Sequence, residues 1–361
     1  MKLITSTVLL KELVSKALKG ASFNKLLPLT SLMSIKCENG KLELCTTDGS
    51  NYLYIRHPFE NEPFKAVVPA DIFGKLVSKL TCDNTTLESA DGVFTVTGNG
   101  KYSIELPLDE NGAEIDYPNP LNNCIEAVVN SEHTIKSSDI ERIINVAKPA
   151  LAVTMETPCY TGYYCDDKRV IATDSFMICG LDCKLFESPK LVSAPMMELV
   201  NLITTDTIKV HSDNDVLVMY SDDCIVYGHT MEGIEDYAVN EISQLLETPL
   251  PKKCTVSKSK LLEILDRLVL FVDAYDNNGI WLTFGKDGLQ ITSKKSSGVE
   301  TVDYIKAPET DEEFAGLIDV IMLQSQIKAY DADAVEIEYG EPQAIKFVST
   351  NSTQLVALLE E

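Results

Sequence analysis

A module of about 120 residues recurs three times along the chain, and this repeat constrains the fold more than any other feature of the sequence. Each copy contains strand-like segments in which apolar and polar residues alternate between turn residues such as Asn-Gly and Asp-Gly. These segments are 27–37, 41–48 and 51–57 in the first copy, 159–165, 168–174 and 175–181 in the second, and 279–285, 288–294 and 299–305 in the third. The chain is therefore expected to fold as repeated units.

Each copy also contains two amphipathic helical patterns, with apolar residues spaced i, i+3, i+4 and i+7. The first set is 7–20, 137–149 and 257–270, and the second set is 69–80, 194–205 and 314–330. We expect an α+β fold made of three tandem domains, each with two helices against antiparallel sheets. Pro- and Asn-rich joints place the domains at 1–122, 123–248 and 249–361.

The composition excludes several classes of protein. No run of 18 apolar residues is present, and the N-terminal segment lacks a small-residue cleavage site, so we expect a cytoplasmic protein. The ten cysteines and four histidines are scattered, without metal-ligand spacing. We therefore expect reduced, mostly buried thiols, no metal and no cofactor.

The sequence contains no complete catalytic motif among those considered next. The segment GNGKYS (98–103) has part of the pattern of a phosphate-binding loop, but Thr95 and Tyr102 stand where that loop requires Gly and Ser or Thr. No nucleophile elbow or zinc-protease motif is present. The sequence thus favours a protein that is not an enzyme.

The distribution of charge distinguishes the helices from the rest of the chain. The net charge is −24 at pH 7, which argues against nucleic-acid binding over the whole surface. The six helical windows nevertheless contain 11 Lys or Arg against 8 Asp or Glu, and in five windows the cations lie opposite the apolar face. Such helices could contact phosphates without reading base sequence, although solvated lysines are also common on any single amphipathic helix.

One segment of each module carries a further signal. The segments are LPLTSLMSIKCENGKLELCTTDGSNYLYI (27–55), KRVIATDSFMICG (168–180) and GIWLTFGKDGLQITS (279–293). All three resemble one family, the bacterial sliding clamp, which is the beta subunit of DNA polymerase III. The second is similar to the Thr-Asp-Gly-His-Arg-Leu motif of the family, and the likeness extends over essentially the whole chain. It implies a head-to-tail homodimeric ring that encircles duplex DNA and tethers a polymerase without catalysing a reaction.

The resemblance also implies three sets of functional residues. The helices lining the ring would contact DNA through Lys11, Lys16, Lys19, Lys25, Lys75, Lys79, Arg142, Lys148, Lys260, Arg267 and Lys328. A hydrophobic pocket for short motifs of polymerase, clamp loader and repair proteins would comprise Tyr160, Thr173, Ser175, Phe176, Met177, Ile178, Val239, Asn240, Leu355, Val356, Ala357 and Leu358. The dimer interface would comprise Tyr102, Ile104, Leu270 and Phe271.

Alternatives remain open for these residues. Met177 and Ile178 could be ordinary core residues, and Tyr102 and Ile104 could pack within their own domain. Where the family has Gly-His-Arg this chain has Ser175-Phe176-Met177, and its tail reads ALLEE (357–361), which suggests a divergent clamp of phage or plasmid type. The second helix of the middle domain carries no Lys or Arg. A clamp-like scaffold that sequesters polymerase or loader without encircling DNA is therefore the alternative function.

Overall fold

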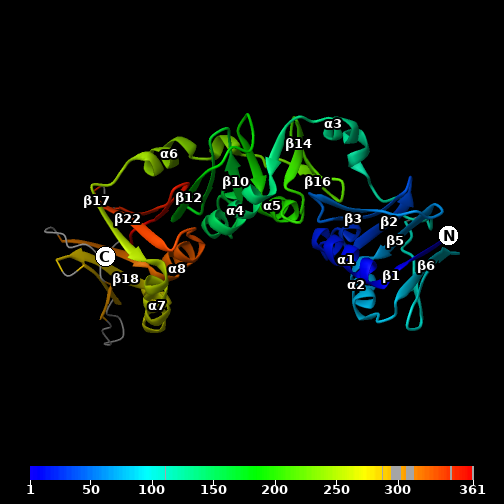
Figure 1. Ribbon diagram of the computed structural model, residues 1–361, viewed down its shortest axis with the longest axis horizontal. Helices are drawn as coiled ribbons and strands as arrows, with labels where there is room; N and C mark the ends of the chain where they lie inside the picture. Colours follow the sequence, from blue (N-terminus) through cyan, green and yellow to red (C-terminus); the bar gives the residue numbers. More distant parts are fainter. Residues whose placement is uncertain (110, 287, 294–301, 306–312, 342–343, 360–361) are drawn as a thin grey trace. The chain divides into compact units, whose positions relative to one another are not determined.

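A computed structural model describes residues 1–109, 111–286, 288–293, 302–305, 313–341 and 344–359 (Figure 1). The expected α+β fold of helices against antiparallel sheets is confirmed. The chain divides into two compact units, residues 1–140 with 195–230 and residues 141–194 with 231–361. The division into three domains at 122/123 and 248/249 stays a prediction.

Unit 1 contains one eight-stranded and one four-stranded sheet. The eight-stranded sheet has the order β5-β2-β3-β4-β16-β15-β14-β9, and the four-stranded sheet has the order β1-β6-β7-β8. The strands are β1 (Lys2–Ser6), β2 (Leu32–Glu38), β3 (Lys41–Thr47), β4 (Tyr52–Pro58), β5 (Phe64–Pro69), β6 (Asn84–Ala90), β7 (Val93–Thr97), β8 (Lys101–Glu105), β9 (Thr134–Lys136), β14 (Thr207–Asp213), β15 (Val216–Tyr220) and β16 (Cys224–His229). All their pairings are antiparallel.

The helices of unit 1 cover both faces of its larger sheet. Helix α1 (Thr7–Ala17) packs on α2 (Ala70–Lys79) and contacts strands of both sheets. The short helix α3 (Ile125–Val129) covers β14 and β15 on the other side (Figure 1). Two further helices, α4 (Ser137–Ala147) and α5 (Ala194–Val200), lie where the chain passes between the units.

Unit 2 repeats this plan. Its eight-stranded sheet has the order β13-β10-β11-β12-β24-β23-β22-β17, and its four-stranded sheet has the order β20-β19-β18-β21. The strands are β10 (Gly162–Cys165), β11 (Arg169–Thr173), β12 (Met177–Asp182), β13 (Lys190–Ser193), β17 (Lys252–Ser257), β18 (Gly279–Gly285), β19 (Gly288–Ser293), β20 (Val302–Ile305), β21 (Phe314–Asp319), β22 (Ala334–Gly340), β23 (Ala344–Val348) and β24 (Ser352–Val356). Helices α7 (Lys258–Leu268) and α8 (Val320–Ala329) pack together, and α6 (Val239–Glu247) contacts β24.

The prediction of one helix over 314–330 is wrong. Residues Phe314–Asp319 form β21, which pairs antiparallel with β18, and only the following residues form α8. The carboxylate of Asp319 marks the change, because its Oδ1 accepts hydrogen bonds from the N–H groups of Ile321 (2.7 Å) and Met322 (3.1 Å) and so caps the helix. A short apolar run such as FAGLI fits a buried strand and a buried helix equally well.

The other sequence expectations are mostly confirmed. The helices expected at 7–20, 69–80, 137–149 and 257–270 are present, whereas the helix expected at 194–205 ends at Val200. The expected strands begin at most five residues from their expected starts, although residues 294 and 299–301 lie outside the described residues. Seven of the ten cysteines are buried, as expected, and all ten are free.

Candidate partner-binding pocket and nucleic-acid surface

The Thr-Asp segment of unit 2 forms a tight turn between β11 and β12. Asp174 Oδ1 accepts hydrogen bonds from the N–H groups of Phe176 (2.8 Å) and Met177 (2.6 Å), and Thr173 Oγ1 donates to the carbonyl of Met177 (2.7 Å). Ser175 adopts a left-handed conformation with φ 80°, which only glycine adopts without cost. The turn therefore holds the Phe176 side chain outward, and that side chain is 55% exposed.

The C-terminal strand is tied to this turn. Strand β24 pairs with β12, so that Leu355 lies opposite Ile178 and Val356 lies opposite Met177. The N–H group of Ala357 then donates a 2.7 Å hydrogen bond to the carbonyl of Phe176. The structure thus brings together the turn and the tail that the sequence placed in one pocket.

Strand alternation divides these residues between the two faces of the sheet. Ile178 and Leu355 belong to an apolar cluster on the face covered by α6. Met177 and Val356 are the next pair in the register, so they point to the face covered by α8 (Figure 1). Met177 is only 7% exposed, which favours the core alternative for this residue.

Leu358 also lies away from the α6 face. A Cβ atom added at Gly316 of β21 would lie 3.0 Å from Leu358 Cδ2 and 3.2 Å from Ile345 Cδ1. Because Ile345 precedes Lys346 on β23, it points to the opposite face of the sheet from Lys346, which lines the cavity beside α6. Leu358 lies close to Ile345 and is therefore on the face away from α6.

The segment before α6 completes the apolar cluster around a buried tyrosine. Tyr237 stacks edge-on against Tyr160, with ring centroids 5.1 Å apart, and donates a 3.2 Å hydrogen bond to the carbonyl of Ile171. Val239 packs against the same cluster, whereas Asn240 is exposed. Burial raises the pKa of the Tyr237 phenol, so this hydroxyl remains a donor.

A cavity of about 380 Å³ opens between α6 and the strands β23 and β24. Of the residues expected in a pocket, only Leu355 lines this cavity. The other lining residues come from α6, from the segment after it and from β23; they are Glu241, Gln244, Leu245, Thr248, Leu250, Ala344 and Lys346. Its walls thus combine four apolar side chains with four polar or charged ones, which could fix the orientation of a bound ligand or peptide.

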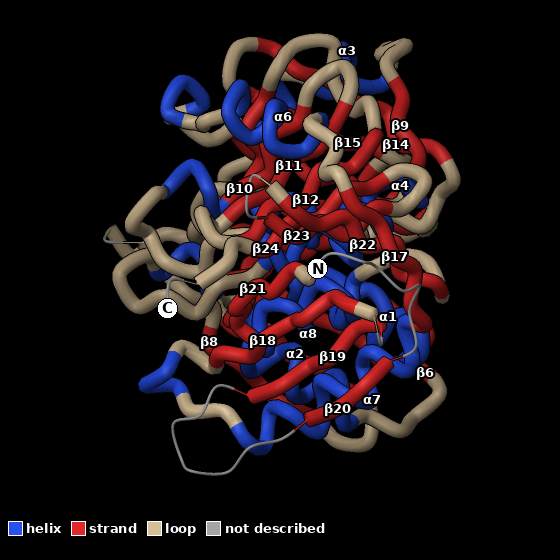
Figure 2. Tube along the Cα trace, turned by 90° about the vertical axis from the view of Figure 1, so that its left-hand side faces the viewer, coloured by secondary structure: helices blue, strands red, loops and turns tan. Residues whose placement is uncertain are grey.

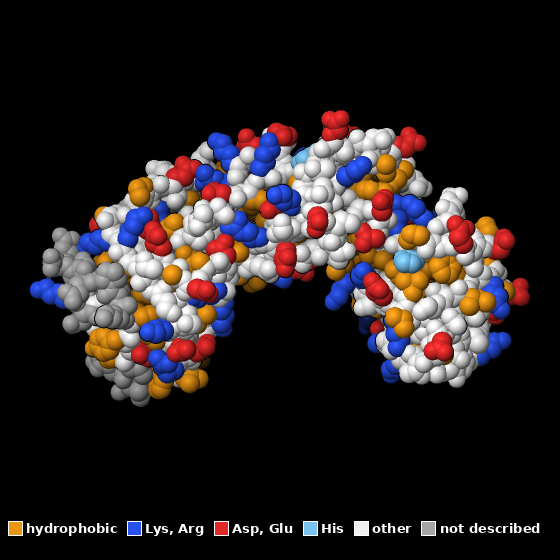
Figure 3. All heavy atoms as spheres, in the orientation of Figure 1, with side chains coloured by type: hydrophobic (Ala, Val, Ile, Leu, Met, Phe, Trp, Pro, Cys, Tyr) orange, Lys and Arg blue, Asp and Glu red, His pale blue; other side chains and the backbone are white. Residues whose placement is uncertain are grey.

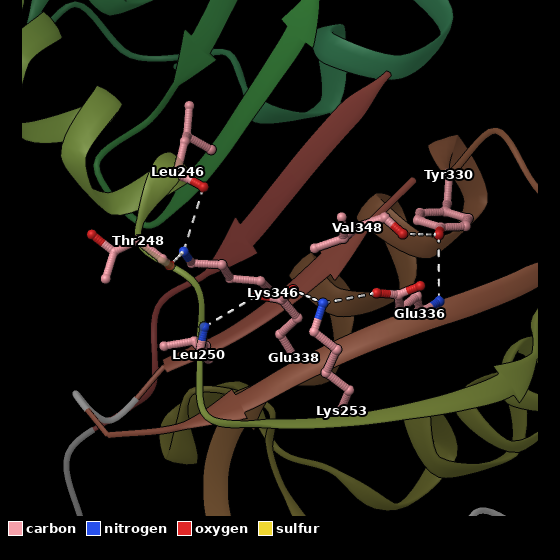
Figure 4. A network of polar contacts seen from close by, with 9 residues as sticks. All are labelled: Leu246, Thr248, Leu250, Lys253, Tyr330, Glu336, Glu338, Lys346 and Val348. Atoms are coloured by element: carbon pink, nitrogen blue, oxygen red, sulfur yellow. Dashed lines mark hydrogen bonds and ion pairs between the residues drawn. The ribbon is translucent and has the colours of Figure 1, made fainter. Parts of the chain in front are cut away.

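Lys346 is the unusual member of this lining because its side chain is buried. It is 2% exposed and donates hydrogen bonds to the carbonyls of Leu246 and Thr248 at the end of α6 (Figure 4). Burial lowers the pKa of the ammonium group, and the charge of Glu338 partly opposes this shift. The lysine therefore caps the C-terminus of α6, where a positive charge is favourable.

Glu338 acts on Lys346 through its charge and belongs to the same group of polar residues (Figure 4). It accepts hydrogen bonds from Leu250 N–H (3.2 Å) and pairs with Lys253 (2.7 Å). Burial alone would raise the pKa of Glu338, but these hydrogen bonds and the charges of Lys253 and Lys346 outweigh it and lower the pKa. The carboxylate is therefore held in its charged form beneath the pocket.

Sequence reasoning missed α6 and Lys346. A signal for the lysine was present, since AIKFV (344–348) places one cation in the middle of an apolar strand. The segment VNEISQLLE (239–247) also has the apolar spacing of an amphipathic helix. Both signals indicate a covered sheet face rather than a simple linker.

The expected DNA-contacting cations lie on helices or beside their ends in both units, except Lys25, which lies in a turn, and most are exposed. Four of them form ion pairs with nearby acids. The pairs are Lys16–Glu12 (2.9 Å), Lys75–Asp71 (2.7 Å), Arg142–Asp331 (2.8 Å) and Arg267–Asp303 (2.6 Å). Figure 3 likewise shows acidic and basic side chains interspersed over one face of the molecule. These pairs reduce the positive potential that the cations present to a phosphate.

Three of the four residues expected at a dimer interface are accessible. Leu270 is 78% exposed, Phe271 43% and Tyr102 39%. Ile104 is 9% exposed and lies opposite Phe94 in the β7–β8 register, which favours the alternative that it packs within its own sheet. Strand β8 is at one edge of its sheet. Strand β20 is at one edge of the other four-stranded sheet, beside β19 (Figure 2).

The described residues lack two other kinds of site. They contain no group of three or more His, Cys, Asp or Glu side chains positioned to hold a metal ion. None of the helices in the described part of the chain is long and apolar enough to cross a bilayer.

Solved structures with the same fold cover the chain from end to end. The beta chain of DNA polymerase III from Streptococcus pneumoniae is 15% identical with a TM-score of 0.85, covering 100% of both chains. The beta subunit from Thermotoga maritima is 18% identical (TM-score 0.83), and the DNA polymerase sliding clamp from Bacillus subtilis is 16% identical (TM-score 0.84). Each of these two covers 100% of this chain, which covers 99% of theirs.

The chain has the sliding-clamp fold. No protein-family model and no curated protein sequence matches it, so the likeness lies in the arrangement of the elements more than in the residues. The resemblance of the three sequence segments to sliding clamps is thus confirmed at the level of the fold.

Proposed function

We propose that the protein is a DNA sliding clamp, a non-catalytic processivity factor that encircles duplex DNA as a head-to-tail homodimeric ring in the cytoplasm. The observation that carries this proposal is the match in fold over 100% of this chain and of the Streptococcus pneumoniae beta chain. A partial match would support a shared domain only.

The edge strands β8 and β20 of the two four-stranded sheets support the homodimer. Strands β4 and β16 join two four-stranded halves in unit 1, and β12 and β24 do the same in unit 2. By its place in the repeated module, β20 is the counterpart of β4 and β12. In the same way, β8 is the counterpart of β16 and β24. Unlike these counterparts, β20 and β8 each lie at the edge of a sheet. Pairing β20 of one protomer with β8 of another would repeat the same junction and leave neither edge exposed.

The pocket of unit 2 supports tethering of partner proteins. We propose that polymerase and clamp loader dock short linear motifs on the exposed Phe176, on the apolar cluster around Tyr237 and in the cavity beneath α6. Phe176 and Leu355 would supply apolar contacts. The buried Lys346 would favour a motif with a carbonyl or carboxylate group near that end of the cavity.

Retention on DNA circles tests the proposal. The protein is mixed with nicked circular DNA at a concentration where it is monomeric and then concentrated, so that rings can close around the circle. A clamp stays on the circle during gel filtration and is lost when the circle is linearised. Equal loss from circular and linear DNA would exclude encirclement.

The ion-paired cations favour one alternative function, a clamp-like scaffold that does not encircle DNA. A clamp-like scaffold that sequesters polymerase or loader would not need free cations, and Lys16, Lys75, Arg142 and Arg267 are already paired. In the retention experiment, such a scaffold would bind polymerase peptides but would not remain on circular DNA.

A further inference from the structure

The two eight-stranded sheets share one plan, so the junction of β4 with β16 in unit 1 corresponds to the junction of β12 with β24 in unit 2. In both sheets a Thr-Asp turn precedes the strand at the junction. Both junctions are also covered by a linker that ends in a helix, α3 in one case and α6 in the other. Unit 1 therefore contains a counterpart of the proposed partner pocket.

The turn of unit 1 repeats the hydrogen bonds of the turn at Asp174. Asp48 Oδ1 accepts from the N–H groups of Ser50 (2.8 Å) and Asn51 (2.7 Å), and Thr47 Oγ1 donates to the carbonyl of Asn51 (2.6 Å). Gly49 has φ 102°, a left-handed conformation like that of Ser175 in unit 2. Ser50 is thus the counterpart of Phe176, and a small polar residue here leaves the mouth of the site open.

The linker of unit 1 is anchored in a similar way. Tyr117 is buried in an apolar cluster with Tyr54 and Tyr227, and its hydroxyl donates a 3.3 Å hydrogen bond to the carbonyl of Leu32. Tyr237 plays the matching part in unit 2. Asn119 is fixed as well, because its Oδ1 accepts a 3.0 Å hydrogen bond from the Tyr54 hydroxyl. The linker wall is therefore held in place.

A cavity of about 640 Å³ lies between this turn, this linker and β16, and we call it the linker pocket. Its walls include rings from Tyr52, Tyr227, His229, Pro118 and Pro120. The Tyr52 and Tyr227 rings are perpendicular with centroids 6.1 Å apart, and the Tyr227 and His229 rings are perpendicular with centroids 5.6 Å apart. A ligand in this pocket would contact both the faces and the edges of aromatic rings.

The charges around the linker pocket favour a cation. Among the described residues that line it, none is Lys or Arg. Asp215 accompanies His229 with a 3.0 Å contact between Oδ2 and Nδ1. Burial is the main cause that raises the pKa of the Tyr227 phenol, and the charges of Cys124 and Asp215 add to it. Aromatic faces beside a carboxylate bind guanidinium and ammonium groups, and the net charge of −24 attracts basic partners.

We propose that the linker pocket binds an extended peptide segment of a partner protein through an arginine or lysine side chain. This inference rests on the proposed function in one respect, namely that a pocket of this construction receives a peptide. The linker pocket would accept a basic side chain among rings, whereas the pocket of unit 2 would accept an apolar one. One chain would then carry two docking sites of different specificity.

The test selects peptides from a phage-displayed library of random 12-residue sequences on the full-length protein. Synthetic versions of the enriched peptides are then titrated by fluorescence anisotropy against the unsubstituted protein and four variants. Ser50→Arg places a cation at the mouth of the linker pocket, and Asp215→Asn removes the carboxylate that contacts the lining residue His229. Ser50→Ala is the neutral control, and Phe176→Ala alters the corresponding position of the other pocket.

We expect a group of peptides that contain Arg or Lys and whose Kd rises about tenfold with Ser50→Arg and severalfold with Asp215→Asn. Ser50→Ala and Phe176→Ala should leave the Kd of these peptides unchanged. Replacing the arginine of the peptide with citrulline should raise the Kd about as much as Ser50→Arg does. Ser50 is exposed and lies in a turn, so the Ser50→Arg variant should fold normally. Its thermal unfolding temperature, compared with that of the unsubstituted protein, checks this.

Three outcomes would overturn the linker-pocket proposal. They are the absence of any peptide sensitive to Ser50→Arg, sensitive peptides without a basic residue, and citrulline peptides that bind as well as arginine peptides. Peptides weakened only by Phe176→Ala would report the pocket of unit 2, so the two sites fail or succeed independently.

Discussion

Lys346 shows how a single buried cation can organise the floor of a pocket. Its ammonium group replaces water for two carbonyls at the end of α6, and Glu338 supplies the opposite charge from the neighbouring strand. Removing one member of such a network leaves buried polar groups without partners, which costs more than the network contributes. The position of α6, and with it the shape of the cavity, depends on this side chain.

Lys346→Met should therefore destabilise unit 2 by about 1–3 kcal/mol, because the methionine fills the space but cannot donate to the two carbonyls. Trp281, on β18 of unit 2, is the only tryptophan, so its fluorescence during urea unfolding reports on this unit. Lys184→Met is the matched control, since Lys184 pairs with Glu187 at an exposed site, and it should change stability by less than about 0.5 kcal/mol.

The difference in stability between the unsubstituted protein and the Lys346→Met variant should depend on pH. The pKa of Lys346 is lowered in the folded state, so the unfolded chain binds more protons at pH values just below 10.5. The unsubstituted protein should thus gain stability relative to the Lys346→Met variant as the pH rises from neutral towards 10. A difference that shrinks over this range would contradict the assignment of Lys346 as a charged, desolvated group.

At the scale of elements, the sequence was most informative where local chemistry decides the structure. The Thr-Asp turn at 173–174 was predictable because its side chains bond to their own backbone. The helix at 314–330 was mispredicted because β21 is specified by its partner β18, which is distant in sequence. For the same reason the pocket was predicted only in part, since Lys346 becomes a lining residue only when β23 passes beneath α6.

The exposed residues beside α7 give a test at the scale of elements. Replacing both Leu270 and Phe271 with Glu should convert the dimer to monomers, because both side chains are exposed and charged groups would be buried in the proposed interface. Sedimentation velocity measures the change. Tyr275→Glu is the control, since this nearby side chain is 97% exposed and lies outside the proposed interface. Dimers that survive the double substitution would place the interface elsewhere.

At the scale of the whole molecule, the proposed function requires an acidic protein to approach DNA. The chain carries 55 acids against 31 Lys and Arg, so contact with phosphates depends on a few cations that are not neutralised by neighbours. Several of the expected cations are not in ion pairs among the described residues, including Lys79 and Lys260. Weak contacts from such residues would hold a ring on DNA without preventing it from sliding.

Freeing one paired lysine tests this idea. Asp71→Asn releases Lys75 from its 2.7 Å ion pair and should strengthen binding to a short DNA duplex, with the slope of log K against log salt concentration steeper by about 0.9 for one added phosphate contact. Asp182→Asn changes the net charge equally, but Asp182, at the end of β12, forms no ion pair with an expected DNA-contacting cation among the described residues, so the slope should not change. Because net charge alone would affect both variants alike, equal slopes would mean that Lys75 does not reach the DNA. Lys79→Gln should act in the opposite direction from Asp71→Asn, since it removes a contact on the same helix without freeing an acid.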